Sequence, residues 1–435
     1  MSYASDNGAK TWAIHGDLTD GTVPRLFEDC ASGNGGGISI NTTSPPAGHN
    51  RWISHIPTGS AQWHYDGNTA SGISLFTTSS QAFAVCVRYL IFSALPSASV
   101  NMFLGTVAGL RDSSAYSQRR FRLRTDGKID MLPSDEAVTI DTSVETLAHS
   151  TTYAVVAVHD NDFGGTSRTS LYYSTDGGAT FTAFTWAGSG QAYVDYSDLD
   201  NPAGPIDEAS LRLGSPLNND NGIVTKWAEV GVMWASEWLG AVPLNFAVGK
   251  FAPNADVVAE WTLNSGTDHF AGVSKEQGTG GGGIKVSETV ADQQEIFGYE
   301  ASDTTKIPAA NTALALKAWA NLRGSSSLPD AANLTHLITD NGATYTYPSH
   351  DGAYSEDHYG GTQHDSSVSL ATMPGGGGRW TPSRIDALEA GLDKVGDDAL
   401  LYNCFQHWLT VPSISNPRSP DPVHPTLMGM SPAII

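Results

Sequence analysis

The chain is dominated by short runs in which apolar and polar residues alternate. Because successive side chains of a β-strand point to opposite faces, such a run gives a strand one apolar face. The clearest example is residues 83–91, FAVCVRYLI. Its apolar residues of one parity are Phe83, Val85, Val87, Tyr89 and Ile91. This pattern predicts a strand that packs one face into a core.

Turn residues separate these runs. Asp126-Gly127 lies between two alternating runs, and Asp340-Asn341-Gly342 lies between two more. Asp-Gly and Asn-Gly favour the tight turns of β-hairpins. The 435 residues include 46 glycines and 22 prolines, and only 16% are charged. The sequence therefore predicts an all-β protein made of sandwiches or barrels.

The length indicates two domains, since 435 residues exceed one ordinary core. Prolines 243 and 253 flank a short apolar stretch, which is typical of a linker. We expect a first β-sandwich over 1–240 and a linker over 241–255. A second sandwich is expected over 256–412, followed by an extended C-terminal arm over 413–435, which is rich in proline.

One helix is expected, over residues 382–395 of the second sandwich. Thr381 is a good N-cap, and Pro382 suits the first helical position. Gly396 suits the left-handed stop. The helical spacing places four apolar residues in one stripe. They are Ile385, Leu388, Leu392 and Val395.

Charge argues against nucleic-acid binding. The formal net charge is −22, and the 23 lysines and arginines form no sustained basic run. The N-terminus lacks the pattern of a signal peptide, and no apolar run approaches the roughly 18 residues needed to span a bilayer. We therefore expect a soluble protein made in a cytoplasm, without membrane insertion. The three cysteines, Cys30, Cys86 and Cys404, favour neither a disulfide framework nor a zinc site.

One hairpin carries a known motif, the Asp-box S-x-D-x-G-x-T-aromatic. Its residues are Ser174, Asp176, Gly178, Thr180 and Phe181. In such a hairpin the aspartate accepts hydrogen bonds from the turn, and the glycine takes a positive φ. Sialidases and related propellers need several such boxes, whereas this chain has one complete copy and a degraded one at residues 340–345. We expect a structural role.

Acidic loops raise the possibility of a metal. Calcium takes oxygen ligands, and three loops supply aspartates, although none has EF-hand spacing. The candidate calcium ligands are Asp160, Asp162 and Asp220. The segment Ser349–Asp365 concentrates histidines and acids that suit a transition metal equally well as a solvated loop. No other cofactor is indicated.

Catalytic motifs are missing from the sequence. There is no G-x-S-x-G nucleophile elbow and no E-x-D-x-x-E string of the laminarinase-like jelly rolls. A glycosidase also needs two facing carboxylates, which a sequence alone does not place. We expect no catalytic residues and no enzymatic activity.

The first half resembles the concanavalin A-like and laminin-G-like jelly rolls. The likeness covers residues 12–240 and rests on Leu-x-Leu-Gly-Ser at 211–215, followed by a loop and the strand WAEVGVMW at 227–234. The second half, residues 249–412, resembles a β-sandwich domain of tailed-phage virion proteins. The residues that carry this second resemblance are Gly249, Pro253, Trp261-Thr262, Ile307-Pro308, Trp319, Trp380-Thr381, Ile385, Leu388 and Gly391.

These resemblances imply a structural component of a virion surface. It would be a head decoration or a fibre or tail-associated protein, assembled in the host cytoplasm as a homo-oligomer with other virion proteins, and its jelly roll would bind host or environmental glycans. Two alternatives stay open: a stand-alone lectin-like carbohydrate-binding protein, and a glycan-degrading enzyme.

Overall fold

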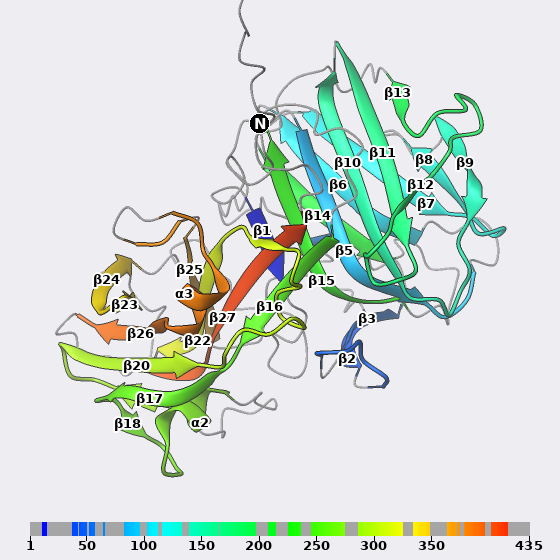
Figure 1. Cartoon of the computed structure of the whole chain (residues 1–435). Coiled ribbons are helices and arrows are strands. Elements are labelled where there is room, and N and C mark those ends of the chain that lie inside the picture. The colour runs from blue at the N-terminus through cyan, green and yellow to red at the C-terminus, as the bar shows by residue number, and fades with distance from the viewer. Residues whose placement is uncertain are drawn as a thin grey trace, which may run out of the picture.

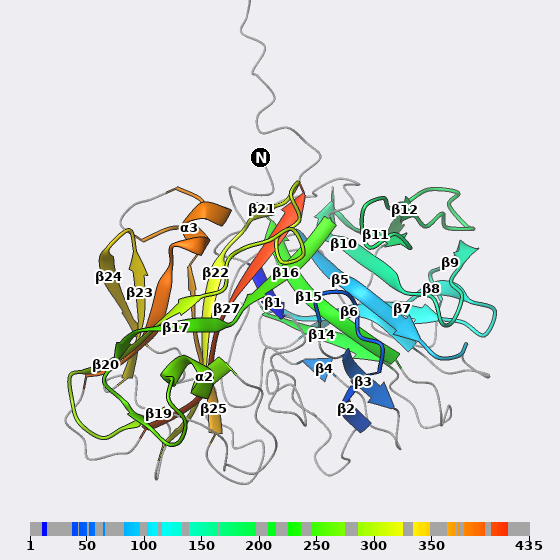
Figure 2. The same ribbon diagram turned by 60° about the horizontal axis from the view of Figure 1, so that its bottom comes forward.

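The chain is seen here in a computed structural model, which describes most of the strands and many of the turns. The described residues are 11–14, 37–41, 43–49, 52–56, 64–65, 82–95, 102–111, 115–132, 139–163, 165–196, 208–214, 225–235, 245–274, 286–324, 334–348, 363–370, 372–374, 378–395 and 402–415. Within them the protein is all-β and its sheets form sandwiches, as the sequence predicts. The described strands form four sheets, and two short helices accompany them. Their arrangement can be followed in Figures 1 and 2.

Strands up to β15 form the two sheets of the first sandwich. The nine-stranded sheet has the order β12 (Thr182–Ala183), β11 (Thr166–Ser174), β10 (Tyr153–Phe163), β5 (Ala82–Phe92), β15 (Thr225–Ala235), β3 (Trp52–Ile56) and β2 (Gly37–Asn41), with β1 (Thr11–Ile14) on β15 and β13 (Val194–Tyr196) on β11. The six-stranded sheet has the order β4 (His64–Tyr65), β14 (Glu208–Gly214), β6 (Met102–Arg111), β7 (Ala115–Leu123), β8 (Lys128–Leu132) and β9 (Asp141–Thr146). Phe121 of β7 lies 5.7 Å from His159 of β10, ring to ring, so the two sheets face each other.

Strands from β16 onward form the second sandwich. Its seven-stranded sheet has the order β18 (Thr262–Leu263), β19 (Val286–Glu288), β27 (Tyr402–Ser415), β22 (Leu316–Gly324) and β25 (Gln363–Leu370), with β16 (Asn245–Phe251) and β21 (Thr312–Ala313) on β27. Its five-stranded sheet has the order β17 (Pro253–Ala259), β20 (Gln293–Tyr299), β26 (Glu389–Lys394), β23 (Leu334–Asp340) and β24 (Ala343–Pro348). The helices are α2 (His269–Ser274) and α3 (Pro382–Asp386).

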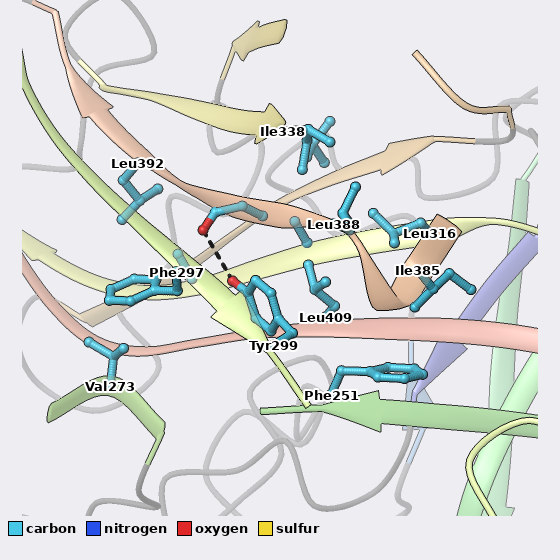
Figure 3. Packing of buried hydrophobic residues seen from close by; sticks show 14 of the residues in the cluster. Phe251, Val273, Phe297, Tyr299, Leu316, Ile338, Ile385, Leu388, Leu392 and Leu409 are labelled. Carbon is cyan, nitrogen blue, oxygen red and sulfur yellow. Dashed lines mark hydrogen bonds between the residues drawn. The ribbon is translucent and has the colours of Figure 1, made fainter. Parts of the chain in front are cut away.

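The core of the second sandwich draws side chains from both of its sheets. Phe297 and Leu392 come from the five-stranded sheet, and Leu316 and Leu409 come from the seven-stranded sheet. Figure 3 shows them packed together beside Tyr299. All five side chains are buried.

The prediction of a linker over residues 241–255 is wrong. Residues 245–251 form strand β16, which pairs with β27 from Asn245↔Ser415 to Phe251↔Leu409. Pro253 is the first residue of the next strand, β17. Short stretches around proline resemble linkers, but a proline is tolerated at the first residue of a strand. The C-terminal arm was predicted to begin at residue 413, but residues 413–415 are the last residues of β27. Residues 416–435 lie outside the described residues.

The expected helix over 382–395 is wrong beyond its first turns. Helix α3 ends at Asp386, and residues 389–394 form β26, a central strand between β20 and β23. Ala390 and Leu392 are buried at the spacing of two that a strand gives, and Leu392 also falls on the helical stripe counted from Ile385. Val395, the last residue of that stripe, is 42% exposed. Helix α2 was not expected, so the second sandwich carries two short helices rather than one.

Candidate functional site

The two sandwiches meet along an apolar joint. Strand β5 carries its large apolar side chains on one face and the small side chains of Ala84 and Cys86 on the other, and this second face lies in the joint. Phe246 and Val248 of β16 and Ile414 of β27 pack against them. Both faces of β5 are therefore buried, one within its own sandwich and one against the other sandwich. Figures 1 and 2 both show β16 beside the first sandwich.

A buried carboxylate ties this joint together. Glu229 of β15 has a φ of 52° and lies between the pairs Ala228↔Tyr89 and Val230↔Val87, with the same register on both sides. Its carboxylate accepts hydrogen bonds from Arg88 at 2.9 and 3.1 Å and from the backbone N–H of Val248 at 2.7 Å. His49 Nε2 lies 2.7 Å from the same carboxylate. One side chain of the first sandwich thus holds a strand of the second.

The charge of this carboxylate is balanced by Arg88. Burial works against the charge of Arg88, but the adjacent Glu229 outweighs it and raises the pKa of the guanidinium. The side chain of Glu229 is 3% exposed. A buried ion pair of this kind fixes geometry more than it adds stability, because desolvation offsets most of the attraction. Through the N–H of Val248 it holds β16 in place against β15.

The Asp-box lies beside the same joint. The carboxylate of Asp176 accepts hydrogen bonds from the hydroxyl of Ser174 and from the N–H and hydroxyl of Thr180, and these bonds lower the pKa of Asp176 well below its ordinary value. Gly178 has a φ of 89°. Phe181 packs against the apolar joint. The hydrogen-bonding groups of the motif are engaged within the hairpin.

A second feature lies on the same outer face of the second sandwich, beyond the joint. We call it the tryptophan–lysine face. It consists of Lys250 of β16, Lys317 and Trp319 of β22, and Trp408 and Thr410 of β27. Cross-strand pairing places Lys250 and Lys317 on either side of Thr410, and Trp319 opposite Trp408. Leu316, Ala318 and Leu409, of the other parity, face the core.

The cations of this face lie over its rings. Lys317 Nζ is 3.9 Å from the ring centroid of Trp319, and Lys250 Nζ is 6.0 Å from that of Trp408. The indole N–H of Trp319 donates to the hydroxyl of Thr410 at 2.8 Å. The indole N–H of Trp408 is buried and has no acceptor among the described residues.

Lys317 is unusual for its burial. It is 9% exposed, no ion pair is formed by it in the described part of the chain, and burial lowers the pKa of its ammonium group to about 7. Lysine is seldom buried to this extent unless it is paired. Sequence reasoning missed this face because Lys317 and Trp319 read as ordinary members of an alternating strand.

A polar cluster crosses the core of the second sandwich. The hydroxyl of Tyr299 lies 2.6 Å from His407 Nδ1, and the ring of His336 lies 6.3 Å from that of His407. Burial and the neighbouring His336 lower the pKa of His407 well below its ordinary value. The Tyr299 hydroxyl also donates to the carbonyl of Ala390, the contact drawn in Figure 3.

Glu295 lies in the same sandwich beneath α2. It is fully buried, accepts a hydrogen bond from the N–H of Trp261 at 3.1 Å, and lies 2.9 Å from His269 Nδ1. Burial raises the pKa of this carboxyl group to about 8. Asp256, a nearby acid, instead accepts hydrogen bonds from the N–H groups of His269 and Phe270 at the start of α2.

The expected calcium ligands are not brought together by the described structure. Asp160 is buried in β10 at 1% exposure. Asp162 follows it on the same strand with its side chain outside the described residues, and Asp220 lies outside them altogether. In the part of the chain that the structure describes, no group of three histidines, cysteines or acids is placed to hold a metal ion.

Other candidate residues are described only in part. Most of Ser349–Asp365 lies outside the described residues, which begin again at Gln363. Cys86 and Cys404 are buried free thiols whose pKa values are raised by burial, and Cys30 lies outside the described residues. Among the described helices, none is long and apolar enough to cross a membrane.

Several residues on which the phage-type resemblance rests pack inside the second sandwich. Trp261, Trp380, Ile385 and Leu388 are all buried in the core of the second sandwich. Gly391 lies so close to the carbonyl of Glu295 that a Cβ there would collide with it. The shared pattern therefore reports how this sandwich packs.

No family model matches the chain, and no curated protein matches it. Similar solved structures include an endo-β-1,4-glucuronan lyase from Trichoderma reesei, with a TM-score of 0.32, 9% identity, and coverage of 52% of this chain and 95% of that one. Arcelin-5, a lectin-like defense protein from Phaseolus vulgaris, has a TM-score of 0.29, 8% identity, and coverage of 51% and 97%. Lectin II from Ulex europaeus has a TM-score of 0.29, 13% identity, and coverage of 51% and 97%. Scores this low carry no inference about function, none of the comparisons points to a phage protein, and the sandwich architecture rests on the strand pairing of this chain itself.

Proposed function

We propose that the chain is a carbohydrate-binding protein that holds a saccharide without cleaving it. What supports this is the first half of the chain: residues 12–240 resemble the concanavalin A-like jelly rolls, and the strands described there form two antiparallel sheets that face each other. Saccharides are recognised by exposed aromatic rings, against which their apolar faces pack, together with a few well-placed donors. Trp319 and Trp408 of the tryptophan–lysine face are only 2% and 7% exposed, so this face does not present its rings to a ligand.

A binding role rather than hydrolysis is favoured by how the perturbed acid is used. Retaining glycosidases place two carboxyl groups about 5–5.5 Å apart across an open cleft. Glu295 is fully buried, and its oxygens are engaged by Trp261 and His269. Asp256 is engaged at α2.

The test is a glycan array followed by calorimetric titration with the best ligand. The full chain should bind at least one saccharide of the array and leave its glycosidic bonds intact. No binding across the array, or release of shortened sugars during the titration, would contradict the proposal.

A second candidate is a role on the surface of a tailed-phage virion, with this chain as a decoration or fibre component. It is favoured by the packing of Trp261, Trp380, Ile385 and Leu388, which gives the phage-type pattern a coherent structural meaning in one core. Mass spectrometry of purified particles tests it. The chain should be present at a fixed stoichiometry, and its absence from particles would end this candidate.

A further inference from the structure

We propose that the second sandwich contains an acid switch, in which His336 and His407 face each other across the core and cannot both bind a proton while the two sheets stay packed. His336 belongs to β23 of the five-stranded sheet, and His407 belongs to β27 of the seven-stranded sheet. Both residues are 0% exposed. Acid would therefore open this core.

The two imidazole rings lie close together on opposite sides of the core. Their centroids are 6.3 Å apart, and the ring of Phe297 lies 5.7 Å from that of His407. His336 pairs with the buried Leu392 of β26. His407 pairs with the buried Ala320 of β22. Two positive charges at this separation repel each other strongly in a core of low polarity, and because they belong to different sheets, the repulsion acts to separate the sheets.

The hydrogen bonds of His407 suit its neutral form. Its Nδ1 lies 2.6 Å from the hydroxyl of Tyr299, which donates to the carbonyl of Ala390 at 3.3 Å. The Nδ1–H group of His407 therefore donates to the oxygen of Tyr299, and an added proton must go to Nε2. That nitrogen is buried and has no partner among the described residues. A charged N–H group is costly to bury without an acceptor.

The surrounding groups offer this charge no counter-ion in acid. The titratable residues at core-facing positions of the packed strands, with those bound to them from the helices, are Glu295 and Tyr299 of β20, Asp340 of β23 with Arg384 of α3, Tyr345 and Tyr347 of β24, His364 of β25, Lys394 of β26, Cys404 of β27, and His269 of α2. Glu295 and Asp340 are the acids among them. Burial raises the pKa of Glu295 to about 8, so this group is neutral in acid. Asp340 accepts its hydrogen bonds from Arg384.

The switch acts below pH 6.5. Burial and the neighbouring His336 lower the pKa of His407 well below its ordinary value of 6.5. The unfolded chain therefore binds a proton at this position more readily than the folded chain, and stability is lost as pH falls below 6.5. Glu295 offsets part of this loss down to about pH 4.5, below which its own contribution no longer changes. The core should therefore open most steeply below pH 4.5.

The experiment follows the thiol of Cys404, which is buried in the same core, in the full chain between about pH 3 and pH 7. Dithiodipyridine labels exposed thiols in acid, and peptide mass spectrometry of Cys404 gives the opening equilibrium at each pH. We expect this equilibrium to rise about 10-fold more per pH unit of acidification in the wild type than in His407→Gln, the effect of one proton. His149→Gln is the matched control, since His149 is exposed in the first sandwich, and it should follow the wild type.

The pH dependence separates a switch from a loss of packing. If His407→Gln only weakened the core, its opening equilibrium would be raised by the same factor at every pH, and this result would overturn the proposal. Equal slopes in the wild type, His407→Gln and His149→Gln would overturn it as well. Circular dichroism at pH 7 shows whether each variant folds. Where His407→Gln does not fold, His336→Gln has the same expected slope, because loss of either ring removes the repelling pair.

Discussion

At the residue scale, the side chain with the most partners at the joint is Glu229. We expect Glu229→Gln to destabilise the protein by about 3–5 kcal/mol, because it leaves Arg88 buried without a counter-ion. Urea denaturation measures the change. Asp195→Asn is the control, since the Arg168–Asp195 pair is partly exposed and such pairs contribute about 0–1 kcal/mol. Similar losses in both variants would show that Glu229 has no special role.

A second residue-scale prediction concerns pH. Glu295 has a folded pKa of about 8, above its ordinary 4.5, so its contribution to stability is complete below about pH 4.5 and is lost as pH rises to 8. His407 has a folded pKa below its ordinary 6.5, so its contribution is complete above 6.5 and is lost as pH falls. The two effects oppose each other between pH 4.5 and 6.5.

From pH 6.5 to 8, the contribution of His407 to stability is constant, and only that of Glu295 still changes with pH. We therefore expect the free energy of unfolding to fall over this range in the wild type, and to fall less in Glu295→Gln. Urea denaturation of both proteins at half-unit pH intervals measures the difference. Identical slopes for the two proteins would show that the carboxyl group of Glu295 is not perturbed by burial.

At the element scale, strand β16 depends on close contact with β15. A Cβ at Gly231 would collide with the ring of Phe246, so Gly231→Val should destabilise the protein by about 1–3 kcal/mol through overpacking. Shortening the ring in Gly231→Val/Phe246→Leu should recover part of the loss. Gly378→Ala is the control, because an added Cβ there meets nothing within 4 Å. Thermal melting compares the four proteins, and a neutral Gly231→Val would contradict the packing described for the joint.

The elements also show what a sequence can predict. Alternation and Asp-Gly turns are local signals, and they correctly identified strands β5, β7 and β8. Residues 389–394 were mistaken for helix because Leu388 and Leu392, four residues apart, satisfy a helical and a strand spacing at once. Tertiary pairing with β20 and β23 decides between them, and no local signal contains that information.

The site was harder to predict than the fold. Lys317 and Trp319 form a tryptophan–lysine face only because a distant strand, β27, places Trp408 and Thr410 beside them. The one available signal was a lysine within an otherwise apolar strand, at Leu316–Ala318. Glu229 gave no signal, because its partners His49, Arg88 and Val248 are far apart in sequence.

At the scale of the whole molecule, the joint makes two sandwiches unfold together. Ala84, Cys86, Phe246 and Ile414 lose their cover if either sandwich unfolds alone. We expect one calorimetric transition with equal calorimetric and van't Hoff enthalpies. Glu229→Gln should separate the transition into two. Two resolved transitions in the wild type would mean that the joint is too weak to couple the sandwiches.

The most direct test of the proposed carbohydrate binding is a glycan array of the full chain, followed by analysis of the bound sugar. The account predicts that at least one saccharide binds and is recovered uncleaved. An array without any bound saccharide, or a bound sugar that is recovered in shorter pieces, would contradict it.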